Sequence, residues 1–507
     1  MFINFVTFIV AACSIIYELA FSYLASIIYG NTTIIYSITI GLFLFFLGVG
    51  TLIYDRLSEK IPNHRMFIIV EIILSFIGFI SSFAIFFFSI YFNETLSMIF
   101  SYLIVIIIAT LSGMEIPLLT SFRRDKKYTN TLSIDYFGSL VGTLLFAFVL
   151  LPYFNIVDTL IITSIVNLTV SLLFSIYMKD KLFTFILSII LIIMLVINIK
   201  IDIEEYVKST FIKEKIERNL MYNLDLKKKP IVTINRYINS PYQEIMDANI
   251  TMEIEGVGKI NDSCLYIDGN NQICDSWVDN YHTFLCKLPL AFYDKRDLDV
   301  LILGGGDLVC AKYLLDSNMV KHIDLVDIDN LIVDYAKKYV TYNKDIYKDP
   351  RLDIHIDDAF HYVINSNKHY DLIIDDLPVI TNEKLLPLLS VEFTKKLNLM
   401  LKDDSDILST MVNTIHNLNE INQFACGGFK KLLYVKGFNI SNPFSDMDYI
   451  DRFLYFSRSN NYIFKNNMLK GRERLIVGNG KVFNISCNTK LKINSIFNLD
   501  YDLMDKE

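Results

Sequence analysis

The chain has 507 residues, of which 53% are hydrophobic and 20% are charged. This composition excludes a disordered chain and is too apolar for an ordinary soluble enzyme. The formal net charge of −8 argues against a nucleic-acid partner, because phosphate binding needs a basic surface. Residues 1–199 contain 9 basic residues (Lys and Arg) and 10 acidic residues (Asp and Glu). Residues 200–507 contain 38 basic and 45 acidic residues. We therefore expect a membrane half joined to an acidic soluble half, whose surface suits cationic ligands.

Seven long apolar segments follow one another in the first half of the chain. A helix needs about 20 apolar residues to cross a bilayer. We expect transmembrane helices at residues 3–28, 33–54, 66–91, 96–119, 132–153, 156–178 and 182–199. The sequence thus predicts an α-helical, multi-pass cell-membrane domain whose partner is the lipid bilayer.

Basic residues gather in alternate connections between these spans: Arg56, Lys60 and Arg65; Arg123, Arg124, Lys126 and Lys127; Lys179 and Lys181. The positive-inside rule places these connections and the N-terminus in the cytoplasm. Seven spans would leave the soluble half outside, which conflicts with the nucleotide chemistry suggested below. We therefore expect a cytoplasmic soluble domain and a miscounted span.

Four acidic residues lie in or beside the spans. Glu18, near the middle of its span, is a candidate for a cation or proton path, because buried carboxylates in lipid are costly. Glu71, Glu115 and Asp135 lie near cytoplasmic helix ends and are expected to be hydrated or to cap helices. Five glycines are expected to permit close helix packing: Gly41, Gly48, Gly50, Gly138 and Gly142.

The seven cysteines stand at positions 13, 264, 274, 286, 310, 426 and 487. They form no CxxC pair and show no metal-ligand spacing, so we expect no metal site. An odd, scattered set predicts no disulfide framework and a reducing compartment.

The soluble half changes its pattern along the chain. Residues 200–229 are polar and helix-like and are expected to form a linker or a membrane-surface helix. Residues 230–290 show short β-type runs that predict a small antiparallel sheet. From about residue 298, apolar strands alternate with helices, so residues 291–507 are predicted to form a doubly wound, Rossmann-like α/β domain. The membrane domain is taken as residues 1–199.

A glycine run follows the first strand of this α/β pattern, in "LDVLILGGGD". Gly304, Gly305 and Gly306 would allow a tight turn beside a ligand, and Asp327 stands where an acid binds ribose hydroxyls. Val309 replaces the third glycine of a dinucleotide fingerprint. The pattern is shared by dehydrogenases and adenosyl-sulfonium enzymes, and the second class is favoured here.

Asp307 narrows the range of ligands that this turn could bind. A carboxylate at this position would repel the carboxylate of S-adenosylmethionine, so a methyltransferase is the less favoured interpretation. It would attract the amine and sulfonium of decarboxylated S-adenosylmethionine. That molecule is expected as a co-substrate, with no other cofactor.

Asp376 ends a later strand, in "YDLIIDDLP", and is the candidate general base. A protonated amine must lose a proton before it attacks carbon, and a neighbouring carboxylate can accept it. Single acids at strand ends also serve as helix caps, which is the role expected of Asp329. Asp375 alternates with Asp376 and should face the other way.

An ordered series of motifs spans almost the whole chain: "IYELAFSYLASIIYG", "GMEIPLL", "DYFGSLVGTLLF", "SPYQEI", "LYIDGNNQ", "LILGGGD", "LVDID", "DPRLDIHIDDAF" and "YDLIIDDLP". The series resembles the membrane-anchored polyamine aminopropyltransferases (spermidine synthases). The resemblance implies transfer of an aminopropyl group from decarboxylated S-adenosylmethionine to putrescine or a related amine, giving spermidine and 5′-methylthioadenosine. It also implies a possible homo-oligomer, since soluble members form dimers or tetramers.

The resemblance assigns roles to individual residues. It implies that Gln243, Gly304, Gly306, Asp327, Asp358 and Ala359 bind the nucleoside, that Gln272, His282 and Asp307 bind the polyamine or aminopropyl group, and that Asp376 is the catalytic proton acceptor.

Several positions depart from the family pattern. Leu308 replaces a loop glycine, Thr283 replaces an acid, and Val379 and Ile380 replace Asp-Pro. The segment 443–456 lacks Trp-Gly-Phe, and the chain's single tryptophan is Trp277. A second hypothesis is therefore a catalytically degenerate domain that binds or senses polyamines at the membrane.

Overall fold

The computed structural model describes residues 1–29, 32–124, 126–200, 203–223, 226–240, 242–254, 258–267, 270–276, 278–340, 345–380, 384–412, 417–436, 452–459 and 481–497. The chain divides into two compact units, Met1–Asn219 and Leu220–Glu507, which are described separately. The domain limits expected from sequence remain a prediction.

The first unit is helical. Its helices are α1 Phe2–Tyr29, α2 Thr32–Leu57, α3 Asn63–Tyr91, α4 Glu94–Ser121, α5 Tyr128–Leu145 with a π-helix at Phe146–Leu150 and α6 Leu151–Tyr153, α7 Ile156–Tyr177 and α8 Lys181–Lys200. Helix α9, Ile203–Asn223, begins in this unit and ends in the second. Within the described residues, seven helices are long and apolar enough to cross a membrane. All seven expected spans are found, so the expected miscount is wrong for this part of the chain.

Small residues set the closest helix contacts. A Cβ atom on Gly50 of α2 would lie 2.0 Å from the Thr110 carbonyl oxygen of α4, and one on Gly138 of α5 would lie 2.4 Å from the Phe8 oxygen of α1. The packing role expected for these glycines and for Gly142 is confirmed. It is wrong for Gly41 and Gly48, which have nothing within 4 Å of an added Cβ.

The acidic residues of the bundle are more deeply buried than expected. Glu71 is 0% exposed and Glu115 is 5% exposed. Asn167 of α7 donates a hydrogen bond to Glu71 through its side chain. The expectation that these two carboxylates are hydrated at helix ends is therefore wrong, because neighbouring helices cover them. Glu18 is also buried, and Asp135 is half-buried.

The second unit begins with the expected antiparallel sheet. Its strands are β1 Ile231–Asn239, β2 Glu244–Ile254, β3 Gly258–Ile267 and β4 Asn270–Cys274, paired in that order. Buried Ile245, Leu265 and Ile273 of this sheet pack against Val309 and Ile332 of the following α/β region. This contact places the loop before β2 beside the first turn of the larger sheet.

The larger sheet has the order β12-β10-β11-β9-β8-β5-β6-β7. Its strands are β5 Leu298–Gly304, β6 Val320–Asp327, β7 Leu352–Ile356, β8 Leu372–Asp376, β9 Ile407–Val412, β10 Lys431–Lys436, β11 Arg452–Ser457 and β12 Lys481–Asn484. Strands β7, β6, β5, β8 and β9 are parallel, and β11, β10 and β12 continue the sheet antiparallel. The strand order reverses between β5 and β8, which is where α/β sheets bind ligands.

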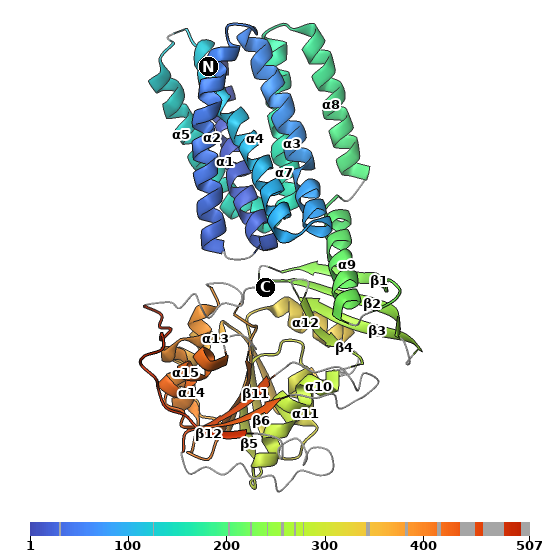
Figure 1. Cartoon of the computed structure of the whole chain (residues 1–507), viewed down its shortest axis with the longest axis vertical. Helices are drawn as coiled ribbons and strands as arrows, with labels where there is room; N and C mark the ends of the chain where they lie inside the picture. The colour runs from blue at the N-terminus through green and yellow to red at the C-terminus, as the bar shows by residue number, and fades with distance from the viewer. Residues whose placement is uncertain are drawn as a thin grey trace. The chain divides into compact units, whose positions relative to one another are not determined.

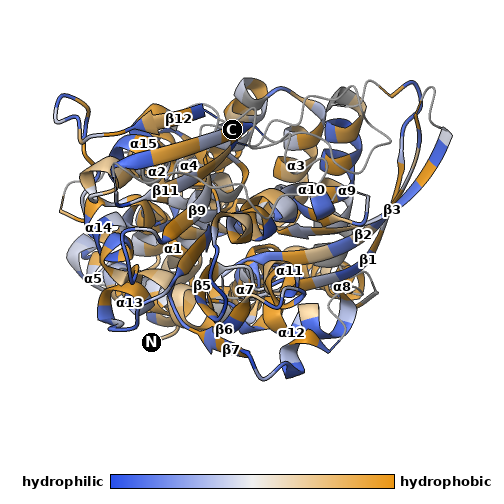
Figure 2. Ribbon diagram, turned by 90° about the horizontal axis from the view of Figure 1, so that it is seen from below, coloured by the Kyte–Doolittle hydropathy of each residue, from blue (hydrophilic) through white to orange (hydrophobic). Residues whose placement is uncertain are grey.

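Helices cover both faces of this sheet (Figure 1). On one face lie α10 Val278–His282, the π-turn η2 Thr283–Lys287, α11 Val309–Leu315 and α12 Asn330–Tyr339; on the other lie α13 Ala359–Asn365, α14 Val391–Met400 and α15 Asn417–Cys426. The central strands are coloured as hydrophobic in Figure 2, as expected when both faces are buried. The predicted doubly wound α/β class is confirmed.

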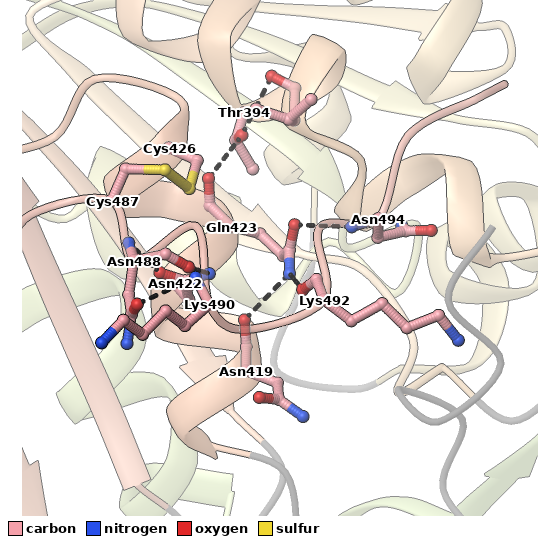
Figure 3. The surroundings of a disulfide bond; sticks show 11 residues. Thr394, Asn419, Asn422, Gln423, Cys426, Cys487, Asn488, Lys490, Lys492 and Asn494 are labelled. Atoms are coloured by element: carbon pink, nitrogen blue, oxygen red, sulfur yellow. Dashed lines mark hydrogen bonds between the residues drawn. A yellow bond between two sulfur atoms is a disulfide. The ribbon is translucent and has the colours of Figure 1, made fainter. Parts of the chain in front are cut away.

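Six of the seven cysteines form disulfides, which contradicts the expected absence of a disulfide framework. The pairs are Cys264–Cys274, Cys286–Cys310 and Cys426–Cys487. The last joins the end of α15 to the segment after β12, beside hydrogen bonds between Asn422 and Asn488 (Figure 3). The seventh, Cys13, is buried in α1 and free. The partners are separated by 10 to 61 residues, so sequence spacing alone did not show which cysteines pair.

Candidate active site

The site is built where β5 and β8 end side by side. Gly304 pairs with Asp376 across these strands, and a Cβ on Gly304 would lie 2.3 Å from the Asp376 carbonyl oxygen. Gly304 also has φ +79°, a conformation that side chains rarely adopt. Glycine is therefore required here by close contact and by backbone conformation.

Asp327, at the end of β6, holds the glycine turn on the expected nucleoside side. Its Oδ2 accepts a hydrogen bond from the Gly306 N–H at 2.8 Å, and its Oδ1 accepts from the Asp329 N–H at 2.9 Å. Burial is the main cause that raises the pKa of Asp327, and the nearby charge of Asp307 adds to it. The carboxylate is thus anchored by backbone donors beside the turn.

Gln243 reaches this group from the loop before β2. Its side-chain amide donates to Asp329 Oδ2 at 2.9 Å. Asp329 is 1% exposed and also caps α12 through a bond from the Leu331 N–H. The helix-cap role expected for Asp329 is confirmed. Its side chain accepts from Gln243 while its backbone N–H donates to Asp327, so this residue links the two.

Asp376, the expected proton acceptor, ends strand β8. Tyr281 of α10 donates its hydroxyl hydrogen to Asp376 Oδ1 at 2.8 Å. Burial raises the pKa of Asp376 to about 6, with a further increase from Asp307, while His282 and Tyr281 act in the opposite direction. Such a carboxylate is ionised at neutral pH and is a stronger base than an exposed aspartate.

Asp375 faces away from Asp376, as the alternation of a strand predicts. Its Oδ2 accepts a hydrogen bond from Thr410 of β9 at 3.1 Å. Burial raises the pKa of Asp375 to about 6. Two adjacent aspartates therefore have similar pKa values but different partners.

Asp307 and Leu308 complete the turn between β5 and α11. Asp307 Oδ1 accepts from the Val309 N–H at 2.9 Å, and the Asp307 charge affects both Asp327 and Asp376. Leu308, which stands where the family has glycine, has φ +64° and is 0% exposed. The chain keeps the left-handed turn and buries the extra side chain.

His282 and Gln272 were both expected on the polyamine side. His282 is buried, and its Nδ1 bonds to the Val278 carbonyl oxygen at 2.9 Å, so that nitrogen carries the hydrogen. Its charge affects Asp376, which places it near the base. Gln272 lies at an irregularity of the β3–β4 pairing with an exposed side chain, and its binding role remains a prediction.

Asp358 and Ala359 follow β7. Asp358 is exposed and caps α13 by accepting from the His361 N–H at 3.1 Å, and Ala359 is buried. The Asp357 N–H donates to the Asp327 carbonyl oxygen, so this corner adjoins the end of β6. The adenine contact expected of Asp358 and Ala359 remains a prediction.

The departures from the family pattern can be placed in part. Thr283 and Ile380 are buried, and Val379 is partly buried. Trp277 and most of segment 443–456 lie outside the described residues; its last part forms β11. At positions 283 and 379, where the resemblance implies an acid, this chain therefore has an uncharged side chain.

Sequence reasoning missed the part that Tyr281 plays. The resemblance gives a role to His282 and none to the tyrosine before it, and a tyrosine in a helix gives no local signal of its partner. Asp376 lies 95 residues later in the chain, so this contact needed the fold.

The strand order reverses beside a glycine turn, next to Asp327 at the end of β6 and Asp376 at the end of β8. This arrangement is typical of α/β transferase domains that bind a nucleoside. Residues 278–433 match the family model described as "Spermine/spermidine synthase domain". The chain is 30% identical over 411 residues to the polyamine aminopropyltransferase of Oceanobacillus iheyensis, covering 79% of this chain and 75% of that protein. It is 27% identical to polyamine aminopropyltransferase 2 of Ralstonia nicotianae, over 77% of this chain and 74% of the relative.

A solved spermidine synthase bound to the transition-state analogue AdoDATO is 20% identical and covers 48% of this chain and 82% of that chain, with a TM-score of 0.37. Because the alignments to the two aminopropyltransferases above cover 79% and 77% of this chain, they extend well beyond residues 278–433. The chain belongs to the polyamine aminopropyltransferase family.

Proposed function

We propose that the chain transfers an aminopropyl group from decarboxylated S-adenosylmethionine to putrescine or a related amine, giving spermidine and 5′-methylthioadenosine. The observation that carries this proposal is Asp376, positioned at the strand-order reversal by Tyr281 and next to the Gly304–Gly306 turn.

The donor would lie along the ends of β5, β6 and β7. Asp327 is presented to ribose hydroxyls by two backbone donors. Asp307, at the turn between the two halves of the site, would stabilise the ammonium of the aminopropyl group. Together these carboxylates favour a dication without a carboxylate group.

The acceptor would enter beside Asp376. Its ammonium first transfers a proton to the Asp376 carboxylate, and the freed nitrogen lone pair then attacks the carbon bonded to the sulfonium. The new C–N bond forms as the C–S bond breaks, and the bond electrons pass to sulfur, leaving the neutral thioether. Alignment of nitrogen, carbon and sulfur supplies much of the rate.

His282 and Tyr281 would set the position and charge of this base. Tyr281 fixes one oxygen of Asp376 and leaves the other for the amine. His282 has its Nδ1 committed to a backbone carbonyl, so its Nε2 is the nitrogen that remains for a polar group of the site.

The first experiment incubates the purified full-length protein with decarboxylated S-adenosylmethionine and a panel of diamines and polyamines. Release of 5′-methylthioadenosine that depends on the amine is the expected result. Saturable amine binding without product for any acceptor would instead support a degenerate, sensing domain.

Seven apolar helices are compatible with membrane insertion. We propose that the protein is a multi-pass membrane enzyme whose partners are the bilayer and the polyamine substrate. A homo-oligomer, as the resemblance implies, is tested by the mass of the detergent-solubilised protein.

A further inference from the structure

The three basic connections lie on one side of the helical unit. Arg65, in the first turn of α3, donates from Nε to Oδ2 of Asp180, between α7 and α8, at 3.3 Å. Arg123, after α4, donates to Asn4 at the N-terminus at 2.6 Å. The connections at the other ends of the spans, around residues 30, 93 and 155, contain no Lys or Arg.

Positive charge favours this side for the cytoplasm. All 9 Lys and Arg of residues 1–199 lie in these three connections, against 5 in residues 200–219 after the last span. Seven described helices can cross a membrane. An odd number of crossings carries the chain after α8 to the side opposite the N-terminus.

The disulfides give independent support. All three pairs lie in Leu220–Glu507, whereas the cysteine of the helical unit is unpaired. They join a hairpin, two neighbouring helical turns and a distant C-terminal segment, so they do not form one redox-active motif. Disulfides distributed through a domain are typical of oxidising compartments.

We infer that residues 220–507, with the candidate active site, lie on the outer, oxidising side of the membrane, opposite the N-terminus. This inference rests on membrane insertion but not on the proposed reaction. It reverses the cytoplasmic placement expected from nucleotide chemistry. The donor nucleoside must accordingly be supplied on that side.

The test attaches a reporter protein after residue 507 of the full chain. Alkaline phosphatase is active only outside the cytoplasm, and green fluorescent protein fluoresces only when it is made inside. Matched fusions after Lys60 report the opposite side. Phosphatase activity at 507 and fluorescence at Lys60 are expected; fluorescence without phosphatase activity at 507 overturns the inference.

Counting the free thiols of the protein tests the oxidising compartment independently of the membrane topology. Cells are lysed directly into denaturant that contains a maleimide, so that every free thiol of the unfolded chain reacts, and the full-length protein is weighed. One adduct, on Cys13, is expected; seven adducts would show that the domain is reduced and would overturn the oxidising compartment. Neither result depends on detecting spermidine.

A second inference concerns the helical unit itself. Glu71 and Asn167 face each other from α3 and α7, with 2.5 Å between Asn167 Nδ2 and Glu71 Oε2. They are 0% and 1% exposed, yet Glu71 Oε1 and Asn167 Oδ1 have no hydrogen-bond partner among the described residues. Both unpartnered atoms are acceptors.

Further buried polar atoms lie one turn away on each helix. The hydroxyls of Ser75 and Ser171 also lack described partners, unlike Ser164, which bonds back to the Leu160 carbonyl. Glu115 of α4 interacts electrostatically with Glu71. An isolated carboxylate is costly in such surroundings, and a primary ammonium offers three donors and no acceptor.

We propose that Glu71 and Asn167 bind the ammonium group of a protonated primary amine inside the helical unit. The carboxylate supplies the charge, and the two free acceptors and a serine hydroxyl receive the three hydrogens. Asn167 lies near the middle of α7, Ile156–Tyr177, so this site is at the depth of the bilayer core and separate from Asp376.

The test measures equilibrium binding of radiolabelled putrescine to the purified full-length protein in lipid nanodiscs. Two sites per chain are expected in the unsubstituted protein and one in Glu71→Gln, whereas Glu18→Gln, a matched buried carboxylate, keeps two. Asn167→Asp adds a second charge and should tighten the same site at least tenfold; unchanged binding in both bundle variants overturns the proposal.

Discussion

Tyr281 donates its phenolic hydrogen to Asp376 Oδ1 at 2.8 Å, joining a short helix to the end of strand β8. The bond leaves the other carboxylate oxygen for a substrate. It also stabilises the ionised form of an aspartate whose pKa burial raises to about 6. One residue thus sets both the orientation and the basicity of the other.

Asp376→Asn should lower turnover by about 10²- to 10⁴-fold, because an amide cannot accept the proton of the incoming ammonium. Donor binding, measured by calorimetry, should survive. Asp375→Asn is the matched control: Asp375 bonds to Thr410 on β9 and should retain most activity. Full turnover in Asp376→Asn would contradict the assigned base.

A plot of log kcat/KM against pH should bend, with its inflection near pH 6. Because the pKa of Asp376 is raised to about 6, the base is ionised above that pH and activity falls as the pH drops below it. A bend near pH 4 would mean that a normally exposed carboxylate controls the reaction.

Tyr281→Phe should move this bend to higher pH. The substitution removes a hydrogen bond that lowers the Asp376 pKa, so protonation then begins earlier as the pH falls. A purely structural role for Tyr281 would reduce the rate at all pH values without moving the bend.

Asp327→Asn should raise the KM for the donor by roughly 10- to 100-fold, which is the range expected for a hydrogen bond to a charged group. Its carboxylate also holds the Gly306 and Asp329 N–H groups, so the turn would loosen. Asp353→Asn, an exposed carboxylate on β7, should leave the KM unchanged. Equal effects of the two would refute the ribose role.

Because Leu308 is buried in a left-handed conformation, we expect glycine at this position to be more stabilising than alanine. Leu308→Ala removes a buried side chain at a cost of about 2–5 kcal/mol and keeps a left-handed conformation. Leu308→Gly removes one carbon more but relieves about 1 kcal/mol of backbone strain. Thermal unfolding of the full-length protein should therefore give a higher Tm for Gly than for Ala; the reverse order would show that the turn relaxes around alanine.

Sequence patterns predicted the features that depend on local order. The seven spans follow from hydrophobic length, and the positions of Gly304, Asp327 and Asp376 follow from strands that end in glycines or acids. Features that depend on distant partners were not predictable: Tyr281 bonds across 95 residues, and Cys426 pairs across 61. The burial of Glu71 was missed because a position near a helix end does not show which helix covers it.

The Cys286–Cys310 bridge joins η2, directly after Tyr281 and His282, to α11, directly after Asp307 and Leu308. The two segments that carry the acceptor and donor sides are thus covalently tied in one place. A newly made chain would have both segments but not the link between them. The oxidation state of Cys286 and Cys310 would then decide whether these two segments are held together covalently or only by packing.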